Sequence, residues 1–195
     1  MPSLPEFALT GEDRCSLLKF ARQCVQATVQ RSPVPAAPPN ASFALICGVF
    51  VTLHVKEKLR GCIGVIETTE PLDASIAHCA AGAALHDPRF SPVRMEELDS
   101  LQIEISLLSP PFPIRIEEIE IGRHGLIVAK DRKRGLLLPQ VAVEHSLDKE
   151  TFLAETCRKA GLPRDAWKME DVQTCGFTCE VFSEQDGMQE RNGCL

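Results

Sequence analysis

The sequence predicts an α+β fold in a single domain. Three observations support this prediction. A capped helical pattern covers about residues 11–30, apolar and polar residues alternate strictly over 101–107, and two pairs of apolar runs, at 43–66 and 124–138, are each interrupted by a short charged turn. A chain of 195 residues buries roughly 70% of the surface that its unfolded form exposes. We therefore expect it to fold without disulfides or metal ions.

The first helix is expected over 11–30. Thr10 and Asp13 have the spacing of a capping box, and apolar residues follow at helical spacing. Four prolines between residues 32 and 40 disfavour regular structure and indicate an extended connector inside the domain.

A β-hairpin is expected next. The run from Phe43 to His54 is nearly all apolar, which is typical of a strand covered on both faces, and a return strand is expected over 59–66 after a polar turn. Pro71 fits the first turn of a second helix. The apolar face of that helix consists mainly of small residues, which predicts close packing: Leu72, Ile76, Ala80, Ala83 and Ala84.

The second half of the chain also contains strand, hairpin and helix patterns. The alternation over 101–107 predicts a half-buried strand, and 124–128 with 134–138 predict another hairpin, closed by Pro139. Asp148 caps a further helix, which ends at Gly161. A last strand is expected over 173–182. The domain then covers 10–182, and the polar tail 183–195 is expected to fray.

Composition limits the classes of function. The formal net charge of −6 disfavours binding along a phosphate backbone, and no apolar run is long enough to span a membrane. The first residues lack the basic and apolar regions of a secretory leader, so we expect a cytoplasmic protein. The nine cysteines are scattered through apolar stretches and are interpreted mostly as buried, reduced thiols.

The best candidate site is the segment 59–64 (LRGCIG). Strand alternation would place Arg60 and Cys62 on one face, about 6.8 Å apart. Gly61 and Gly64 would leave the backbone open to a ligand, and a nearby guanidinium would favour the Cys62 thiolate and suit an anion. The alternative is structural: the glycines mark a bulge or tight packing, Arg60 forms an ion pair, and Cys62 is a buried spacer.

A second candidate site is the corner after the second helix, residues 86–90 (HDPRF). His86 and Asp87 place an imidazole beside a carboxylate, and Arg89 adds a guanidinium that could bind a ligand. In the structural alternative, Asp87 forms an Asx-type turn and Arg89 pairs with a carboxylate. Both interpretations stay open at this point.

A metal centre is disfavoured by spacing. Cys79 and His86 would lie roughly 10 Å apart along a helix, and Cys175 and Cys179 would lie roughly 13 Å apart along a strand. The basic run 130–134 is placed on a hairpin turn, where charge is solvated, and it has no interleaved aromatic residues to stack on bases. No common hydrolase, NTPase or dehydrogenase motif is present, and the residues indicate no particular cofactor.

Several segments together resemble the AMMECR domain family. They lie in order and at compatible spacing between about 10 and 182: LRGCIG at 59–64, DPRF at 87–90, LQIEIS at 101–106, HGL at 124–126 and LPQV at 138–141. Within that family the chain is most similar to the stand-alone AmmeMemoRadiSam system protein A. The resemblance implies an antiparallel sheet flanked by helices, and a larger and a smaller subdomain that form a cleft. It also implies two partners, a MEMO-type protein and a radical SAM protein.

Three hypotheses about function follow. The first is a binding or adaptor component that takes a small polar or anionic ligand and acts with those partners. The second is an enzyme in which Cys62 is the nucleophile or thiolate, Arg60 the anion clamp, and His86 or Asp87 the group that moves protons. The third, a nucleic-acid regulator, is disfavoured by the acidic charge. We favour the first, because no complete set of acid, base and nucleophile can be assembled from the sequence.

Overall fold

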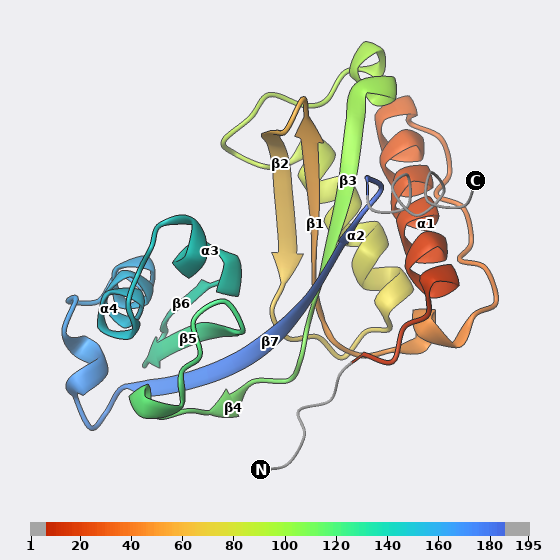
Figure 1. Cartoon of the computed structure of the whole chain (residues 1–195). Helices are drawn as coiled ribbons and strands as arrows, with labels where there is room; N and C mark the ends of the chain where they lie inside the picture. The colour runs from red at the N-terminus through yellow and green to blue at the C-terminus, as the bar shows by residue number, and fades with distance from the viewer. Residues whose placement is uncertain (1–6, 186–195) are drawn as a thin grey trace, which may run out of the picture. The chain divides into compact units, whose positions relative to one another are not determined.

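A computed structural model describes residues 7–185, which form two compact units (Figure 1). The larger unit contains the described residues up to Leu107 and those from Glu180 onward, and the smaller unit is Leu108–Cys179. The strands follow the order β2-β1-β3-β7-β5-β6, and β4 also pairs with β7. The fold is α+β with a mainly antiparallel sheet and helices, which confirms the predicted fold class.

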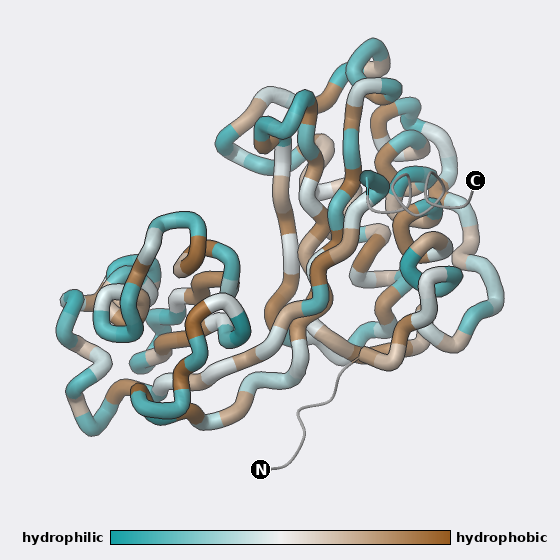
Figure 2. Tube along the Cα trace, in the orientation of Figure 1, coloured by the Kyte–Doolittle hydropathy of each residue, from teal (hydrophilic) through white to brown (hydrophobic). Residues whose placement is uncertain are grey.

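The larger unit packs two helices against a sheet. Its helical elements are α1 (Gly11–Gln30), α2 (Leu72–Leu85) and the short 3₁₀ helices η1 (Ala41–Ala44) and η2 (Met95–Ser100). Its strands are β1 (Gly48–Val55), β2 (Lys58–Val65), β3 (Leu101–Leu108) and the end of β7 (Gln173–Ser183). Hydrophobic residues follow the strands, whereas the β1–β2 turn and η2 are hydrophilic (Figure 2).

The predicted helix signals are confirmed in the larger unit. The Thr10 hydroxyl accepts a hydrogen bond from the Asp13 backbone N–H at 3.1 Å, and the Asp13 carboxylate accepts from the Thr10 N–H at 2.9 Å. The small-residue face of α2 is buried against the core as predicted. One boundary differs, because Pro71 is the residue before α2 and not part of its first turn.

The start of the first strand was predicted incorrectly. Phe43 belongs to η1, and β1 begins five residues later at Gly48. The Asn40 side chain accepts a hydrogen bond from the Ser42 N–H at 2.9 Å, which caps η1. The Phe43 ring also packs edge-on against Phe20, with 5.3 Å between the ring centroids. This tertiary contact overrides the apolar strand-like pattern.

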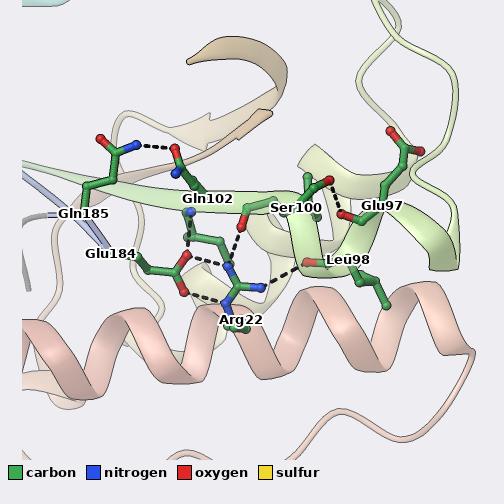
Figure 3. A network of polar contacts seen from close by, with 9 residues as sticks. Arg22, Glu97, Leu98, Ser100, Gln102, Glu184 and Gln185 are labelled. Atoms are coloured by element: carbon green, nitrogen blue, oxygen red, sulfur yellow. Dashed lines mark hydrogen bonds and ion pairs between the residues drawn. The ribbon is translucent and has the colours of Figure 1, made fainter. Parts of the chain in front are cut away.

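A charged network joins α1 to the end of β7 in the larger unit (Figure 3). The Arg22 guanidinium donates two hydrogen bonds of 2.5 Å to Glu184 and further bonds to the backbone carbonyls of Leu98 and Leu101. Glu184 also accepts from the Ile103 N–H at 2.9 Å. Glu184 belongs to the segment 183–195 that was predicted to fray, and residues 186–195 lie outside the described part.

We expect Arg22→Met to lower the free energy of unfolding by about 2 kcal/mol, because hydrogen bonds to a half-buried charged group are lost. Lys19→Met, on an exposed position of the same helix, is the matched control and should change it by less than about 0.5 kcal/mol. Urea titrations of the three proteins measure this difference. Equal effects of the two substitutions would contradict a stabilising role for the Arg22 network.

The smaller unit packs helices against the β5–β6 hairpin. Its strands are β4 (Phe112–Pro113), β5 (His124–Lys130), β6 (Lys133–Leu137) and the first part of β7. Its helices are η3 (Ile116–Glu118), α3 (Pro139–Glu144), α4 (Lys149–Lys159) and η4 (Ala166–Lys168). The hairpin, α4 and β7 confirm the predicted elements. Pro139 does more than close the hairpin, because it opens α3, where its fixed φ suits the first helical position.

His124 is a buried polar residue of the smaller unit, only 5% exposed. Its Nδ1 accepts a hydrogen bond from the Glu120 backbone N–H at 3.1 Å, and its ring packs edge-on against Phe112. Burial lowers the pKa of this histidine below its usual 6.5. The folded state therefore favours the neutral imidazole over the protonated one.

This burial predicts a pH dependence. A histidine whose pKa is lower in the folded state binds protons more readily when unfolded, so stability is full above the unfolded pKa and falls as the pH drops below about 6.5. His124→Asn, whose amide oxygen can replace Nδ1 as acceptor, should flatten the pH dependence between about 7 and 5. Urea titrations across that range measure this effect. Identical slopes in the two proteins would show that His124 is not responsible.

None of the helices among the described residues is long and apolar enough to cross a membrane.

Candidate functional site

The two candidate segments meet at the free edge of β2, the first strand in the sheet order. The backbone N–H of Cys62 donates a hydrogen bond of 2.8 Å to the carboxylate of Asp87. The Arg89 guanidinium donates to the Cys62 carbonyl at 3.4 Å. The corner after α2 therefore supplies the hydrogen-bond partners that an edge strand otherwise lacks.

Asp87 is the centre of this arrangement and is only 4% exposed. Besides the Cys62 N–H, its carboxylate accepts from the Arg89 backbone N–H at 3.1 Å and from two guanidinium nitrogens at 2.9 and 2.7 Å. The hydrogen bonds from Arg89 hold the pKa of Asp87 well below its usual range. Asp87 is thus firmly ionised at neutral pH and poorly suited to accept a proton.

Arg60 anchors the segment that precedes β3. Its guanidinium forms a bidentate ion pair with Glu97, at 2.8 and 3.1 Å, and donates to the carbonyls of Ser91 and Pro92. The pKa of Glu97 is lowered, mainly by this bond to Arg60. The β1–β2 register shifts at this point, because His54 pairs with Leu59 and Leu53 with Gly61. Arg60 is therefore the extra residue of a bulge, which aims its side chain at the 91–97 segment.

The Cys62 thiol is half-buried and has different neighbours from Arg60. Cys62 lies opposite Thr52 in the β1–β2 pairing, and the Thr52 hydroxyl donates a hydrogen bond to its sulfur at 3.4 Å. No motif indicates Thr52 as a site residue, because the register of the hairpin decides which residue faces Cys62.

The two glycines of the segment are covered by protein atoms. A Cβ atom on Gly61 would lie 2.2 Å from the carbonyl oxygen of Ala83 in α2, and one on Gly64 would lie 2.2 Å from the ring of Phe50. The glycines therefore allow close packing of the hairpin. At both positions the Cβ direction is occupied by protein atoms, which is the tight packing of the structural interpretation.

The remaining predicted residues lie at the surface. His86 is the exposed C-cap residue of α2, and its backbone N–H donates to the Gly82 carbonyl at 2.8 Å. Within residues 7–185, no hydrogen bond or ion pair joins its ring to Cys62 or Asp87. The Arg89 side chain is 54% exposed and also lies over the ring of Phe90, 5.4 Å from its centroid.

A pocket of about 500 Å³ opens beside Arg60. Its other lining residues come from the segment that Arg60 anchors: Ser91, Arg94, Glu96 and Glu97. Arg60 and Glu97 neutralise each other, so Arg94 and Glu96, both exposed, remain to meet a ligand. Sequence reasoning missed Glu97, Arg94 and Glu96 because they belong to no motif and are placed by the Arg60 ion pair.

The cysteines and the basic run offer no second centre among the described residues. No group of three or more His, Cys, Asp or Glu in residues 7–185 could hold a metal ion. The eight cysteines of this range are free thiols, and four of them are buried: Cys24, Cys47, Cys79 and Cys157. Burial raises the pKa of Cys79 to about 12. In the basic run, Lys130 pairs with Asp171 at 2.7 Å and Lys133 donates to the Gly161 carbonyl.

Comparison with known proteins defines the family. The sequence model of the AMMECR1 family matches residues 18–182, and the chain therefore belongs to the AMMECR1 family. A protein of Thermococcus gammatolerans is 44% identical over 182 residues, covering 87% of this chain and 89% of the relative. Protein MJ0810 of Methanocaldococcus jannaschii is 40% identical over 185 residues, covering 90% and 92%.

A solved structure has the same fold. The crystal structure of the uncharacterized protein PH0010 from Pyrococcus horikoshii superposes with a TM-score of 0.81 at 41% sequence identity, covering 86% of this chain and 89% of PH0010. The predicted family is thereby confirmed. The names of these relatives assign no ligand, partner or reaction.

Proposed function

We propose that this protein is a cytoplasmic binding component that acts as an adaptor for a MEMO-type protein and a radical SAM protein. The observation that supports this proposal is that the polar side chains around the LRGCIG strand form hydrogen bonds and ion pairs within the protein. Asp87 and Arg60 are used to hold the chain together, so Asp87 is not offered as a general base and Arg60 is not a free anion clamp. The partners are those that the family resemblance implies.

The surface offered for binding is the pocket beside Arg60. Arg94 provides a cation and Glu96 a carboxylate, and both are exposed. Such a pair suits a small polar ligand with an acidic group, or a charged side chain of a docked partner. The Arg60–Glu97 pair fixes the segment that carries them, which reduces the entropy lost on binding.

A pull-down with the purified MEMO-type and radical SAM proteins tests the proposal. Arg94→Ala combined with Glu96→Ala should weaken capture of a partner by at least about tenfold, with a melting temperature within about 2 °C of wild type. The matched control is Arg123→Ala with Glu120→Ala, an exposed ion pair in the smaller unit with the same net charge change. If wild type captures neither partner at micromolar concentration, or if both double variants behave alike, the proposal fails.

A second candidate function is an enzyme with a cysteine nucleophile. The specific observation is the Thr52 hydroxyl 3.4 Å from the sulfur of the half-buried Cys62. We propose that this hydroxyl orients the sulfur and that Cys62 is the nucleophile. Iodoacetamide labelling followed by peptide mapping should then show Cys62 modified faster than a model thiol at pH 7, and Thr52→Val should slow it. Labelling no faster than that of Cys15, a half-buried control, would exclude the nucleophile role.

A further inference from the structure

A second pocket, of about 660 Å³, lies within the smaller unit between α3, α4 and the end of β6. Its volume is that of a small-molecule site. It shares no residue with the pocket beside Arg60. The proposed adaptor function makes no use of it.

Three of the lining residues are apolar. Leu137 at the end of β6, Val141 in α3 and Leu147 in the following loop line it, and all three are half-buried. Leu137 and Leu147 also pack against the core of the smaller unit. The apolar lining is therefore fixed by the fold and can cover the hydrocarbon part of a ligand.

The other lining residues are polar and come mainly from one face of α4. Thr151, Glu155, Arg158 and Lys159 follow the helical spacing that places them together, and His145 adds a ring from the end of α3. Thr151 is half-buried, whereas His145, Arg158 and Lys159 are exposed. The same cavity is thus lined by hydrocarbon side chains and by hydrogen-bond donors.

The polar residues of the lining carry a net positive charge. Glu155, the carboxylate in the lining, is already paired with Arg158 at 2.7 Å and with Arg164 at 3.0 Å. Arg158 uses its Nε in that pair, which leaves its terminal N–H groups for a ligand. Lys159 has no carboxylate within ion-pair distance in the described part of the chain. The lining thus holds two cations, Arg158 and Lys159, and one carboxylate that is already paired, in a chain whose formal net charge is −6.

We propose that this pocket binds a small amphipathic anion, with its hydrocarbon part against Leu137, Val141 and Leu147 and its acidic group at Arg158 and Lys159. A carboxylate and a phosphate monoester share this chemistry. A cation is excluded by the surplus of positive charge, and a fully apolar molecule would leave the donors of α4 without an acceptor.

Titration by ¹H–¹⁵N NMR with four eight-carbon probes tests the proposal. Octanoate and octyl phosphate represent the two acidic groups, and octylamine and octanol are the controls for charge. Backbone amides of residues 137–159 should shift with saturation for at least one acid, and its dissociation constant should be about tenfold lower than that of octanol. Whichever acid binds more tightly identifies the acidic group.

Matched variants locate the site. Arg158→Gln with Lys159→Gln should weaken binding of the tighter acid about tenfold. Arg132→Gln with Lys168→Gln removes the same charge from exposed positions of the smaller unit outside the pocket, and it should bind like wild type. If the first double variant loses its dispersed spectrum, Lys159→Gln alone serves, because no ion pair depends on that side chain among the described residues.

The proposal is overturned if octylamine binds as tightly as the acids, if the two double variants bind alike, or if the amide shifts map outside 137–159. Its failure leaves the adaptor proposal intact, because the pull-down depends on residues of the larger unit.

Discussion

Asp87→Ala is expected to lower the free energy of unfolding by about 4 kcal/mol, the largest effect of any substitution considered for this protein. The Asp87 side chain is 2% exposed and accepts hydrogen bonds from the Cys62 N–H and from three N–H groups of Arg89. Alanine would leave the edge of β2 without an acceptor and the Arg89 guanidinium without its counter-charge. Urea titration gives the free energy directly.

Two further variants make this result specific. Asp99→Ala removes an exposed carboxylate from the same unit and should cost less than about 0.5 kcal/mol. Asp87→Asn keeps the shape, but its amide group would face a donor, either the Cys62 N–H or the guanidinium, so it should be nearly as destabilising as alanine. A nearly neutral Asp87→Asn would show that the carboxylate is not needed for stability and would reopen a role in proton transfer.

The same carboxylate predicts an acid dependence. Its pKa is lower in the folded than in the unfolded state, so its contribution is complete above the unfolded value of 3.8 and is lost as the pH falls below it. Wild type should therefore lose stability below about pH 4 more steeply than Asp87→Ala. This window lies below that of His124, so the two contributions can be separated in one pH series.

Gly61→Ala is expected to lower the free energy of unfolding by about 3 kcal/mol, because a methyl group would lie 2.2 Å from the Ala83 carbonyl oxygen. That oxygen belongs to the backbone of α2, so relief requires the whole helix to move away from the hairpin. Thermal and urea unfolding of the variant measure the cost. A change in the near-ultraviolet circular dichroism would report the altered packing of the unit.

Two other glycines supply graded controls. Gly64→Ala meets the ring of Phe50, a side chain that can rotate, so its cost should be smaller than that at Gly61. Gly11→Ala meets nothing within 4 Å at the start of α1, and it should be neutral or slightly stabilising because alanine restricts the unfolded chain. A Gly61→Ala variant as stable as Gly11→Ala would contradict the close approach of α2 to β2.

Local chemistry made much of the fold predictable. The capping box at Thr10, the Asp148 cap and the alternation over 101–107 act within a few residues, and each is found where the sequence placed it. The two hairpins are also confirmed, since charged turn residues between apolar runs specify them. The errors lie where tertiary contacts compete with local pattern, as in η1, where Phe43 packs on Phe20.

The candidate site also combines features that local sequence predicts with features that tertiary contacts decide. The sequence by itself determined the family and both segments that meet at the edge of β2, because LRGCIG and DPRF are recognisable as short motifs. Only the tertiary structure decided what those residues do. Arg60 pairs with Glu97, 37 residues away, and Asp87 binds the backbone of Cys62 across 25 residues. Such partners are chosen by packing and register, which no short-range pattern records, so the ion pair by which Arg60 anchors the segment 91–97 is visible only in the tertiary structure.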